Sequence, residues 1–297
     1  MAMETGTTKD ANLAKVQDID FSQRFGYSVK KLIEALGITR KLPKSAGTVL
    51  KAYKVTGTLK SGKVGEGEAI PLSEYSTTYT AIGEVTLEKW AKSTTAEAIS
   101  NKGYKQAVID TDNKMLQDIQ KEIRKKFFDF LATGTGTATG TGLQAALAQC
   151  WGQLQILFED DTIESVYMLN PLDVADYLAT AEVSTQSAFG MTYIENFLGL
   201  GTVFLNSSVP KGKIYATAKE NIVLYYIPVN GADLGEAFTF TSDETGYIGV
   251  HHESDYTNLT NDTTAVSGVG LFAENLAGVV VGTISAPAAS GTDDSGT

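Results

Sequence analysis

The sequence predicts an α+β fold, and three observations lead to that prediction. Residues 104–131 have the periodicity of a long amphipathic helix, and strands alternate with a helix from about residue 163 onward. A charged segment with three glycines, residues 60–75, separates two strand-like runs. A chain of 297 residues that is 42% hydrophobic can bury a sizeable core without disulfides or metals.

The N-terminal segment, residues 1–45, is expected to form an arm. Its apolar residues recur every three or four positions and predict a helix over 21–36, which Gly37 ends. These apolar residues are Phe21, Phe25, Val29, Leu32, Ile33 and Leu36. Six basic residues lie between Arg24 and Lys44, against one acid, Glu34, so the arm is basic.

Residues 46–92 are expected to form strands around a long loop. A β-rich run covers Val49 to Val55, and a second extended run covers Tyr79 to Trp90. The segment 60–75 between them cannot build a core of its own, which predicts a projecting hairpin or loop. A loop of this length needs a purpose, and contact with a neighbouring subunit would supply one.

Residues 104–131 give the strongest helix signal in the chain. The apolar positions that define the helix are Val108, Met115, Ile119, Ile123, Phe127 and Phe130. A second amphipathic helix is expected from Leu143 to Phe158. The threonine- and glycine-rich segment between them, 133–142, is expected to be a flexible linker.

The last part of the chain is expected to alternate strands and helices. A buried strand at 165–169 precedes Asn170-Pro171, which begins a helix that extends to about Ala179. Further strands are expected at 202–205, 213–216, 222–227, 237–241 and 246–252, with a turn at 210–212. Residues 265–284 predict a final strand pair, or one strand with a break near Glu274. Residues 285–297 are expected to be a disordered tail.

The sequence contains no convincing catalytic, metal or cofactor motif. Gly57 to Lys63 matches GxxxxGK, but Val64 stands where a phosphate loop needs Ser or Thr, so a hairpin tip is expected. Gly134 to Gly142 lack the spacing of a dinucleotide loop. His251 and His252 would point to opposite sides of a strand, and no further histidine completes a zinc site. We therefore expect no enzyme activity, metal or cofactor.

Cys150 is the only cysteine, which excludes an internal disulfide and fits a reducing compartment. It lies on the apolar face of its predicted helix, so we expect a small core residue. A signal peptide and a membrane-spanning run are not visible in the sequence.

Charge is distributed unevenly along the chain. Residues 1–126 carry 21 basic and 15 acidic side chains, whereas residues 127–297 carry 3 basic and 20 acidic side chains. The first part therefore has a balance of +6 and the second a balance of −17, which together give the net charge of −11. Two interpretations remain open: the halves differ by drift, or the basic half of one copy meets the acidic half of the next. The acidic total argues against tight, non-specific binding to nucleic acid.

Three segments resemble motifs of the major capsid proteins of tailed bacteriophages. They are GEGEAIPLSEY at 65–75, SVYMLNPLDVADY at 165–177 and LFAENLAGVVVG at 271–282. The resemblance implies the Hong Kong 97-type capsid fold, with an N-terminal arm (1–45), an extended loop (46–92) and a peripheral domain with a long spine helix (93–160). An α/β axial domain (161–260), closing strands that return to the core (261–284) and a tail (285–297) would follow.

The resemblance also implies a function and a set of partners. Copies would assemble into pentamers and hexamers of an icosahedral shell that encloses double-stranded DNA, in the virion after assembly in the host cytoplasm. A separate scaffolding protein is expected because only about 20 polar residues precede the arm helix; a portal and decoration proteins are further expected partners. Alternatives are a nanocompartment shell of related fold, another virion protein such as a tail-tube subunit, and, more remotely, an enzyme.

The implied mechanism is that loops and arms lie across adjacent subunits. Loop contacts are expected from Lys60, Lys63, Glu66, Glu68, Ile70, Pro71, Glu74 and Tyr75. Arm contacts are expected from Arg24, Lys30, Lys31, Arg40 and Lys41.

Overall fold

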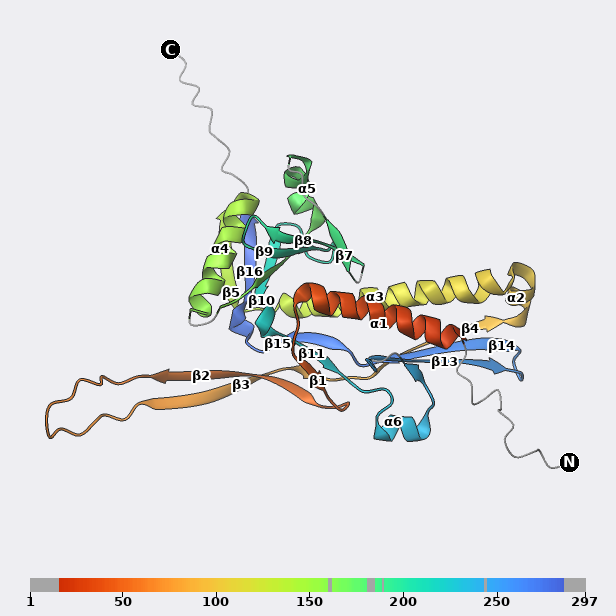
Figure 1. Ribbon diagram of the computed structural model, residues 1–297, viewed down its shortest axis with the longest axis horizontal. Helices are drawn as coiled ribbons and strands as arrows, with labels where there is room; N and C mark the ends of the chain where they lie inside the picture. The colour runs from red at the N-terminus through yellow and green to blue at the C-terminus, as the bar shows by residue number, and fades with distance from the viewer. Residues whose placement is uncertain (1–15, 160–161, 181–184, 189, 243–244, 286–297) are drawn as a thin grey trace, which may run out of the picture.

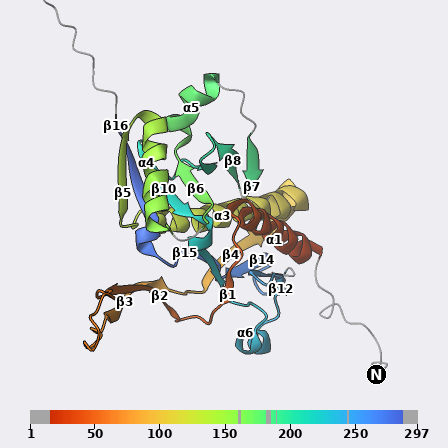
Figure 2. The ribbon, with the colours of Figure 1, turned by 60° about the vertical axis from the view of Figure 1, so that its left-hand side comes forward.

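The computed structural model describes residues 16–159, 162–180, 185–188, 190–242 and 245–285. The molecule is elongated (Figure 1): a two-stranded hairpin projects from one end, and the tips of a second sheet lie with helix α2 at the other. A lobe that contains the largest sheet stands between these ends, and Figure 2 shows it from the side.

Helices occur along the whole described chain. They are α1 (Val16–Leu36), α2 (Ala96–Lys102), α3 (Asp110–Leu131), α4 (Gly142–Leu157), α5 (Pro171–Thr180) and α6 (Ala232–Ala237). A π-helical turn (Lys105–Ile109) leads directly into α3.

The strands form four sheets among the described residues. The early strands are β1 (Lys41–Pro43), β2 (Val49–Thr58), β3 (Glu74–Glu84), β4 (Glu88–Thr95), β5 (Gly136–Thr141) and β6 (Ser165–Leu169). The middle strands are β7 (Gln186–Ala188), β8 (Met191–Phe197), β9 (Gly201–Leu205), β10 (Lys213–Ala218) and β11 (Ile222–Tyr226). The last strands are β12 (Thr241–Ser242), β13 (Ile248–Asp255), β14 (Thr260–Ser267), β15 (Gly270–Ala273) and β16 (Val279–Ser285).

The largest sheet has seven strands in the order β5-β16-β10-β6-β9-β8-β7. Every residue of its central strand β6 is buried, because side chains pack on both faces of the sheet. Tyr167 and Leu169 pack with helix α4 and with Val174 of α5 on one face. Val166 and Met168 belong instead to the core cluster that contains residues of α1 and α3.

A second sheet has the order β12-β13-β14-β4 and is antiparallel throughout. Helix α1 packs against β13 and β12, and it also contacts α3. The apolar stripe that predicts α1 faces inward, since Phe21, Phe25, Val29 and Leu36 are all buried. The seven-stranded sheet with α4 forms one lobe, and the four-stranded sheet with α1 forms the other. A third sheet, β1-β11-β15, lies between these two lobes at the root of the hairpin β2–β3.

Most of the elements expected from the sequence are present. Helices form at 16–36, 110–131, 142–157 and 171–180, and strands form at 165–169, 201–205, 213–218, 222–226 and 248–255. Asn170 caps α5, because its side-chain oxygen accepts a hydrogen bond from the Leu172 N–H at 3.0 Å. The expected break near Glu274 is also present, as a 3₁₀ turn (Leu276–Gly278) between β15 and β16.

The expected linker at 133–142 is wrong in its second half. Residues Gly136–Thr141 form β5, which pairs in parallel with β16 at the edge of the seven-stranded sheet. A Cβ atom on Gly136 would lie 2.9 Å from its nearest neighbouring atom, and a Cβ atom on Gly140 would lie 2.3 Å from its nearest one. The glycines therefore permit close packing, although glycine usually disfavours strands.

Two further local predictions need correction. The strand expected at 237–241 is instead the end of helix α6, a short connection and the beginning of β12. The extended run at 79–90 is divided between two strands, since β3 belongs to the hairpin and β4 to the four-stranded sheet. The tail expected at 285–297 lies outside the described residues, apart from Ser285 at the end of β16.

The sheets also cut across the expected segment boundaries. Strand β5, from the segment 93–160, belongs to the seven-stranded sheet. Helix α4, from the same segment, packs on that sheet and not beside α3. Strand β13, from the segment 161–260, pairs with β14 in the four-stranded sheet. The chain therefore passes between the two lobes more often than a linear division allows, and the boundaries themselves stay a prediction.

Candidate assembly surfaces

The hairpin β2–β3 is the most prominent projection of the molecule. Its strands pair from Val49↔Glu84 to Thr58↔Glu74, with one register irregularity after Leu50. The chain turns back near the tip, where the Glu68 N–H donates to the Gly65 carbonyl and Gly67 adopts a positive φ of 84°. The GxxxxGK match at 57–63 therefore lies on a strand end and the hairpin tip, as expected, with no helix beside it in the described chain.

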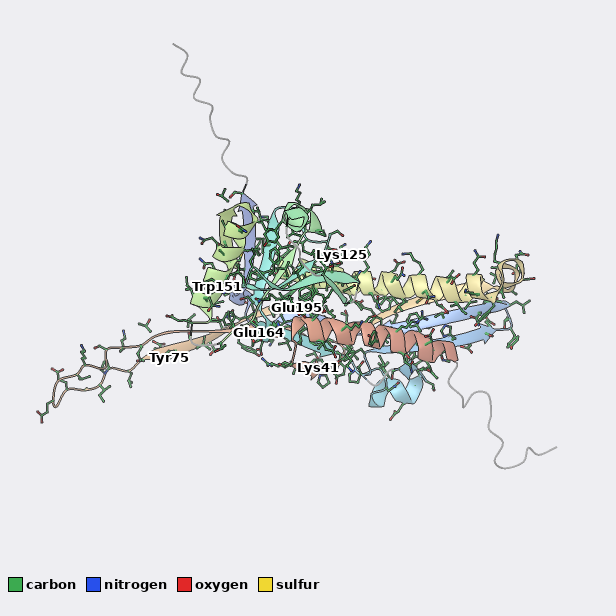
Figure 3. All side chains as sticks on the ribbon, turned by 45° about the horizontal axis from the view of Figure 1, so that its top comes forward. Lys41, Tyr75, Lys125, Trp151, Glu164 and Glu195 are labelled. Atoms are coloured by element: carbon green, nitrogen blue, oxygen red, sulfur yellow. The ribbon has the colours of Figure 1, made fainter. Side chains whose placement is uncertain are left out.

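The loop residues predicted to contact a neighbour all lie on this hairpin and are all exposed. They are Lys60, Lys63, Glu66, Glu68, Ile70, Pro71, Glu74 and Tyr75. Figure 3 shows Tyr75 on the projecting part, away from Lys41 on the body. Two apolar side chains near the tip were missed by the prediction: Leu59 and Leu72 are 78% and 90% exposed. The signal that could have found them is an apolar residue inside an otherwise polar loop.

The arm residues have a different setting, because the described part of the arm packs on its own chain. Arg24 contacts Asn113 of α3 and pairs with Asp20 at 2.7 Å. Arg40 forms a two-pronged ion pair with Glu274, the residue that follows β15. Both guanidinium groups therefore bind within the subunit. Lys30, Lys31 and Lys41 stay exposed, and the Lys31 amino group lies 4.6 Å from the centre of the Tyr27 ring.

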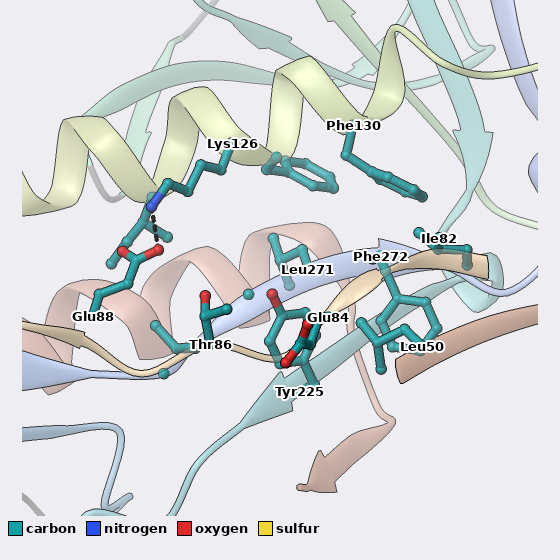
Figure 4. A pocket seen from close by; sticks show the side chains of 16 residues that line it. Leu50, Ile82, Glu84, Thr86, Glu88, Lys126, Phe130, Tyr225, Leu271 and Phe272 are labelled. Carbon is teal, nitrogen blue, oxygen red and sulfur yellow. Dashed lines mark hydrogen bonds and ion pairs between the residues drawn. The ribbon is translucent and has the colours of Figure 1, made fainter. Parts of the chain in front are cut away.

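The root of the hairpin is fixed to α3 around a pocket of about 130 Å³ (Figure 4). Leu50 and Ile82 from the hairpin meet Phe130 of α3 and Phe272 of β15 there. At its edge, Lys126 of α3 pairs with Glu88 of β4. Burial by itself lowers the pKa of Lys126, but the pairing with Glu88 outweighs it and raises the pKa, so the amino group stays charged. The base is thus tied to the body, whereas the distal part projects away from it.

A buried polar cluster holds the two long helices on the four-stranded sheet. His252 of β13 is 1% exposed, and its two ring nitrogens contact Asp18 of α1 and Asp112 of α3, the latter at 3.2 Å. Asp112 also pairs with Lys92 of β4 at 2.7 Å and accepts a hydrogen bond from Thr263 of β14. Residues from both helices and from three strands therefore meet in one cluster.

The electrostatics of this cluster favour a charged imidazole. Burial by itself lowers the pKa of His252, but the hydrogen bonds with Asp112 and Asp18 outweigh it and raise the pKa. Burial likewise raises the pKa of Asp112, yet contacts with His252 and Lys92 bring it below the ordinary value. His251, by contrast, points outward, so the expected opposite orientation of the two histidines is confirmed. No sequence pattern pointed to the two aspartate partners.

Nothing among the described side chains forms a recognisable catalytic centre. Cys150 is fully buried on α4 as expected, and burial raises the pKa of its thiol to about 12, which makes it unreactive. Within the described residues, no group of three or more His, Cys, Asp or Glu side chains is arranged to hold a metal. None of the described helices is both long and apolar enough to span a membrane.

Comparison with known proteins identifies the architecture. No protein-family model and no curated protein matches the sequence. Solved structures do match: the capsid asymmetric unit of cyanophage A-1(L) has a TM-score of 0.57 at 11% identity, over 84% of this chain and 91% of that one. The chain has the Hong Kong 97-type capsid fold.

Two further structures support that identification. A chain of Gordonia phage Cozz has a TM-score of 0.55 at 11% identity, over 86% of this chain and 87% of that one. The virus-like particle from Pyrococcus furiosus has a TM-score of 0.52 at 11% identity, over 89% of this chain and 97% of that one. The hairpin β2–β3 and the helix α3 are the elements expected from the sequence to be the extended loop and the spine helix, and that assignment stays a prediction. The fold class predicted from the sequence is therefore confirmed.

Proposed function

We propose that this protein is a shell-forming subunit, the major capsid protein of a tailed bacteriophage. The observation that carries the proposal is the hairpin β2–β3, which projects from a capsid-type fold with large apolar side chains left in solvent. An exposed apolar projection is costly for a monomer and becomes favourable when a neighbouring subunit covers it. The protein would act by assembly and not by catalysis.

In this proposal, copies form pentamers and hexamers of an icosahedral shell around double-stranded DNA. The hairpin residues from Lys60 to Tyr75 would contact an adjacent subunit, as would Lys30, Lys31 and Lys41 from the arm segment. DNA would be enclosed without sequence-specific binding, which suits a chain with a net charge of −11. Scaffolding, portal and decoration proteins are the partners that such a shell would need, and the virion, assembled in the host cytoplasm, would be its location.

A nanocompartment shell of related fold is the second candidate. The virus-like particle from Pyrococcus furiosus has a similar fold over 97% of its chain, so the similarity extends beyond structures that are named as phage capsids. The two candidates differ in what the shell encloses: DNA for a capsid, and cargo protein for a nanocompartment. A tail-tube subunit is less well supported, because the long helix α3 does not suit a mostly β-sheet protein.

Expression of the full chain, followed by electron microscopy and sedimentation, tests shell formation. We expect closed shells, or pentamers and hexamers, at micromolar protein concentration. Because a capsid subunit can need a scaffold, the same measurement is repeated on particles isolated from a producing host with an antibody against this chain. A strictly monomeric protein in both preparations would contradict the proposal. Nuclease-protected DNA in the isolated particles would favour the capsid, and a protein cargo without DNA would favour the nanocompartment.

A further inference from the structure

The two faces of the hairpin β2–β3 differ sharply in chemistry. Directly opposed residues in an antiparallel pair share a face, and so do residues two positions apart on one strand. Tyr53 lies opposite Tyr79, and Gly57 lies opposite Tyr75, so these residues and Val55 are on one face. We call this the tyrosine face; its large side chains are Tyr53, Val55, Tyr75 and Tyr79.

The opposite face is polar along the projecting part of the hairpin. Thr56 lies opposite Ser76, and Thr58 lies opposite Glu74. The Thr56 and Ser76 hydroxyls are 3.2 Å apart, so they satisfy each other. We call this the threonine face; its projecting side chains are Thr56, Thr58, Glu74, Ser76 and Thr78. Water can cover this face at little cost, whereas the tyrosine face leaves ring and methyl surface in solvent.

The tyrosine face is organised but uncovered. Its four large side chains are each between 59% and 65% exposed. The rings of Tyr53 and Tyr79 pack with centres 6.4 Å apart, and the Lys51 amino group lies 4.6 Å from the centre of the Tyr79 ring. Tyr75 lies across Gly57, where a Cβ atom would be 2.2 Å from the ring. The face therefore presents three tyrosines along one side of the hairpin, with Val55 and Thr77 between Tyr75 and the Tyr53–Tyr79 pair.

This surface continues into a groove in the body of the protein. Lys51 and Tyr53 line a groove of about 460 Å³ together with Leu42 of β1, Lys44 just after β1, and Phe272 of β15. Lys44 and Lys51 are among the residues that line the groove, while the carboxylate of Glu274 is paired with Arg40. A groove lined by apolar and basic residues suits an acidic partner surface.

We infer that the tyrosine face and the groove that continues it form the surface buried against a second copy of this chain, while the threonine face stays in solvent. Glu74 lies on the threonine face, so the inference removes this residue from the contacts given in the proposed function. The inference rests on the proposed function and specifies which side of the hairpin makes the contact. A second copy is the occupant that the charges favour, since residues 127–297 of the same chain carry a balance of −17. Tyrosine is also enriched at protein interfaces, where it buries a large area at low entropic cost.

Site-specific photo-cross-linking tests the orientation. Benzoyl-phenylalanine replaces Tyr53 or Tyr79 on the tyrosine face, and replaces Thr56 or Thr78 on the threonine face as a matched control. Copies labelled with ¹⁴N and ¹⁵N are mixed before assembly, so that mass spectrometry separates cross-links between copies from those within one. We expect cross-links between copies from positions 53 and 79, and few or none from positions 56 and 78. Equal yields from both faces, or a preference for 56 and 78, would overturn the inference.

A second measurement does not depend on the bulky probe. The double variant Tyr53→Ser, Tyr79→Ser is expected to raise the protein concentration needed for assembly by about tenfold or more. The control Thr56→Ser, Thr78→Ser is expected to leave it within about twofold. Both variants should keep the melting temperature of the unassembled protein, because the changed side chains are exposed. An unchanged assembly threshold in the tyrosine variant would also overturn the inference.

The outcomes separate this inference from the proposed function. If the unmodified protein forms no shell or capsomer in either preparation, the proposed function fails first. If the protein assembles but the cross-links arise from the threonine face, the proposed function is supported and the inferred orientation of the hairpin is wrong.

Discussion

His252 shows how much a single side chain can organise in this protein. An imidazole that contacts carboxylates through both nitrogens can satisfy both only as a cation, because the neutral ring has one N–H donor. Its partners Asp18 and Asp112 come from α1 and α3, which are separated by the whole hairpin in sequence. Spacing along the chain predicts that His251 and His252 point apart, but it carries no information about partners from distant elements. That part of the structure could not be predicted.

Replacing His252→Gln should therefore destabilise the subunit. The glutamine leaves Asp18 and Asp112 buried without the positive charge between them, which should cost about 3 kcal/mol in the free energy of unfolding. Urea unfolding of the unassembled protein measures this value. The matched control is His251→Gln at the neighbouring, more accessible position, which should change the free energy by less than about 0.5 kcal/mol. Similar losses in both variants would contradict the role of His252.

The same cluster should make stability depend on pH in two directions. His252 has a raised pKa, so its contribution is complete below its ordinary value of 6.5 and is lost as pH rises through the raised pKa. Asp112 has a lowered pKa, so its contribution is complete above its ordinary value of 3.8 and is lost as pH falls through the lowered pKa. Chemical unfolding of the wild-type protein across the acidic, neutral and alkaline ranges should show both losses. His252→Gln should lack the alkaline one, and parallel curves for the two proteins would contradict the assignment.

At the scale of elements, strand β5 shows where propensity misleads. Glycine and threonine in alternation predict a linker, because glycine is unfavourable in strands and the segment carries little apolar surface. In the structure, small residues are what the position needs, since helix α4 folds directly back onto this strand. Helices α1 and α3 were predictable for the opposite reason: their apolar stripes are long and regular, and both stripes are largely buried.

Two glycine substitutions distinguish close packing from mere flexibility. A Cβ atom at Gly140 would lie 2.3 Å from the Ala146 backbone nitrogen, so Gly140→Ala should destabilise the protein by about 2 kcal/mol or more. Gly152, inside helix α4, has open space where a Cβ atom would lie, so Gly152→Ala should stabilise by about 0.5–1 kcal/mol. Thermal unfolding of both variants checks the pair. A neutral or stabilising Gly140→Ala would show that β5 does not need its glycine there.

At the scale of the whole molecule, the charge split gains a structural meaning. The basic half, residues 1–126, contains α1, the hairpin and most of α3, whereas the acidic half, residues 127–297, contains every strand of the seven-stranded sheet. The projection and the larger lobe thus belong to halves of opposite charge. Composition alone leaves drift and complementarity equally open. The hairpin itself is neutral, because Lys51, Lys54, Lys60 and Lys63 are balanced by Glu66, Glu68, Glu74 and Glu84, so its place in the basic half leaves both interpretations open.

Salt dependence of assembly decides between these two interpretations. If the basic half of one copy meets the acidic half of the next, screening weakens the attraction, and raising NaCl from about 50 to about 500 mM should slow initial assembly by about tenfold. If the halves differ only by drift, the dominant long-range force is repulsion between copies that each carry −11, and the same salt should speed assembly. Light scattering after mixing, at fixed protein concentration, gives the initial rate.

The variant Tyr53→Ser, Tyr79→Ser is the internal control for the salt series. It carries the same charge as the unmodified chain, so it should assemble more weakly at every salt concentration and keep the same dependence on salt. Apolar burial, unlike attraction between opposite charges, is not weakened by screening, so the two contributions separate in this comparison. A rate that rises with salt in both proteins would exclude charge complementarity as the force that steers assembly.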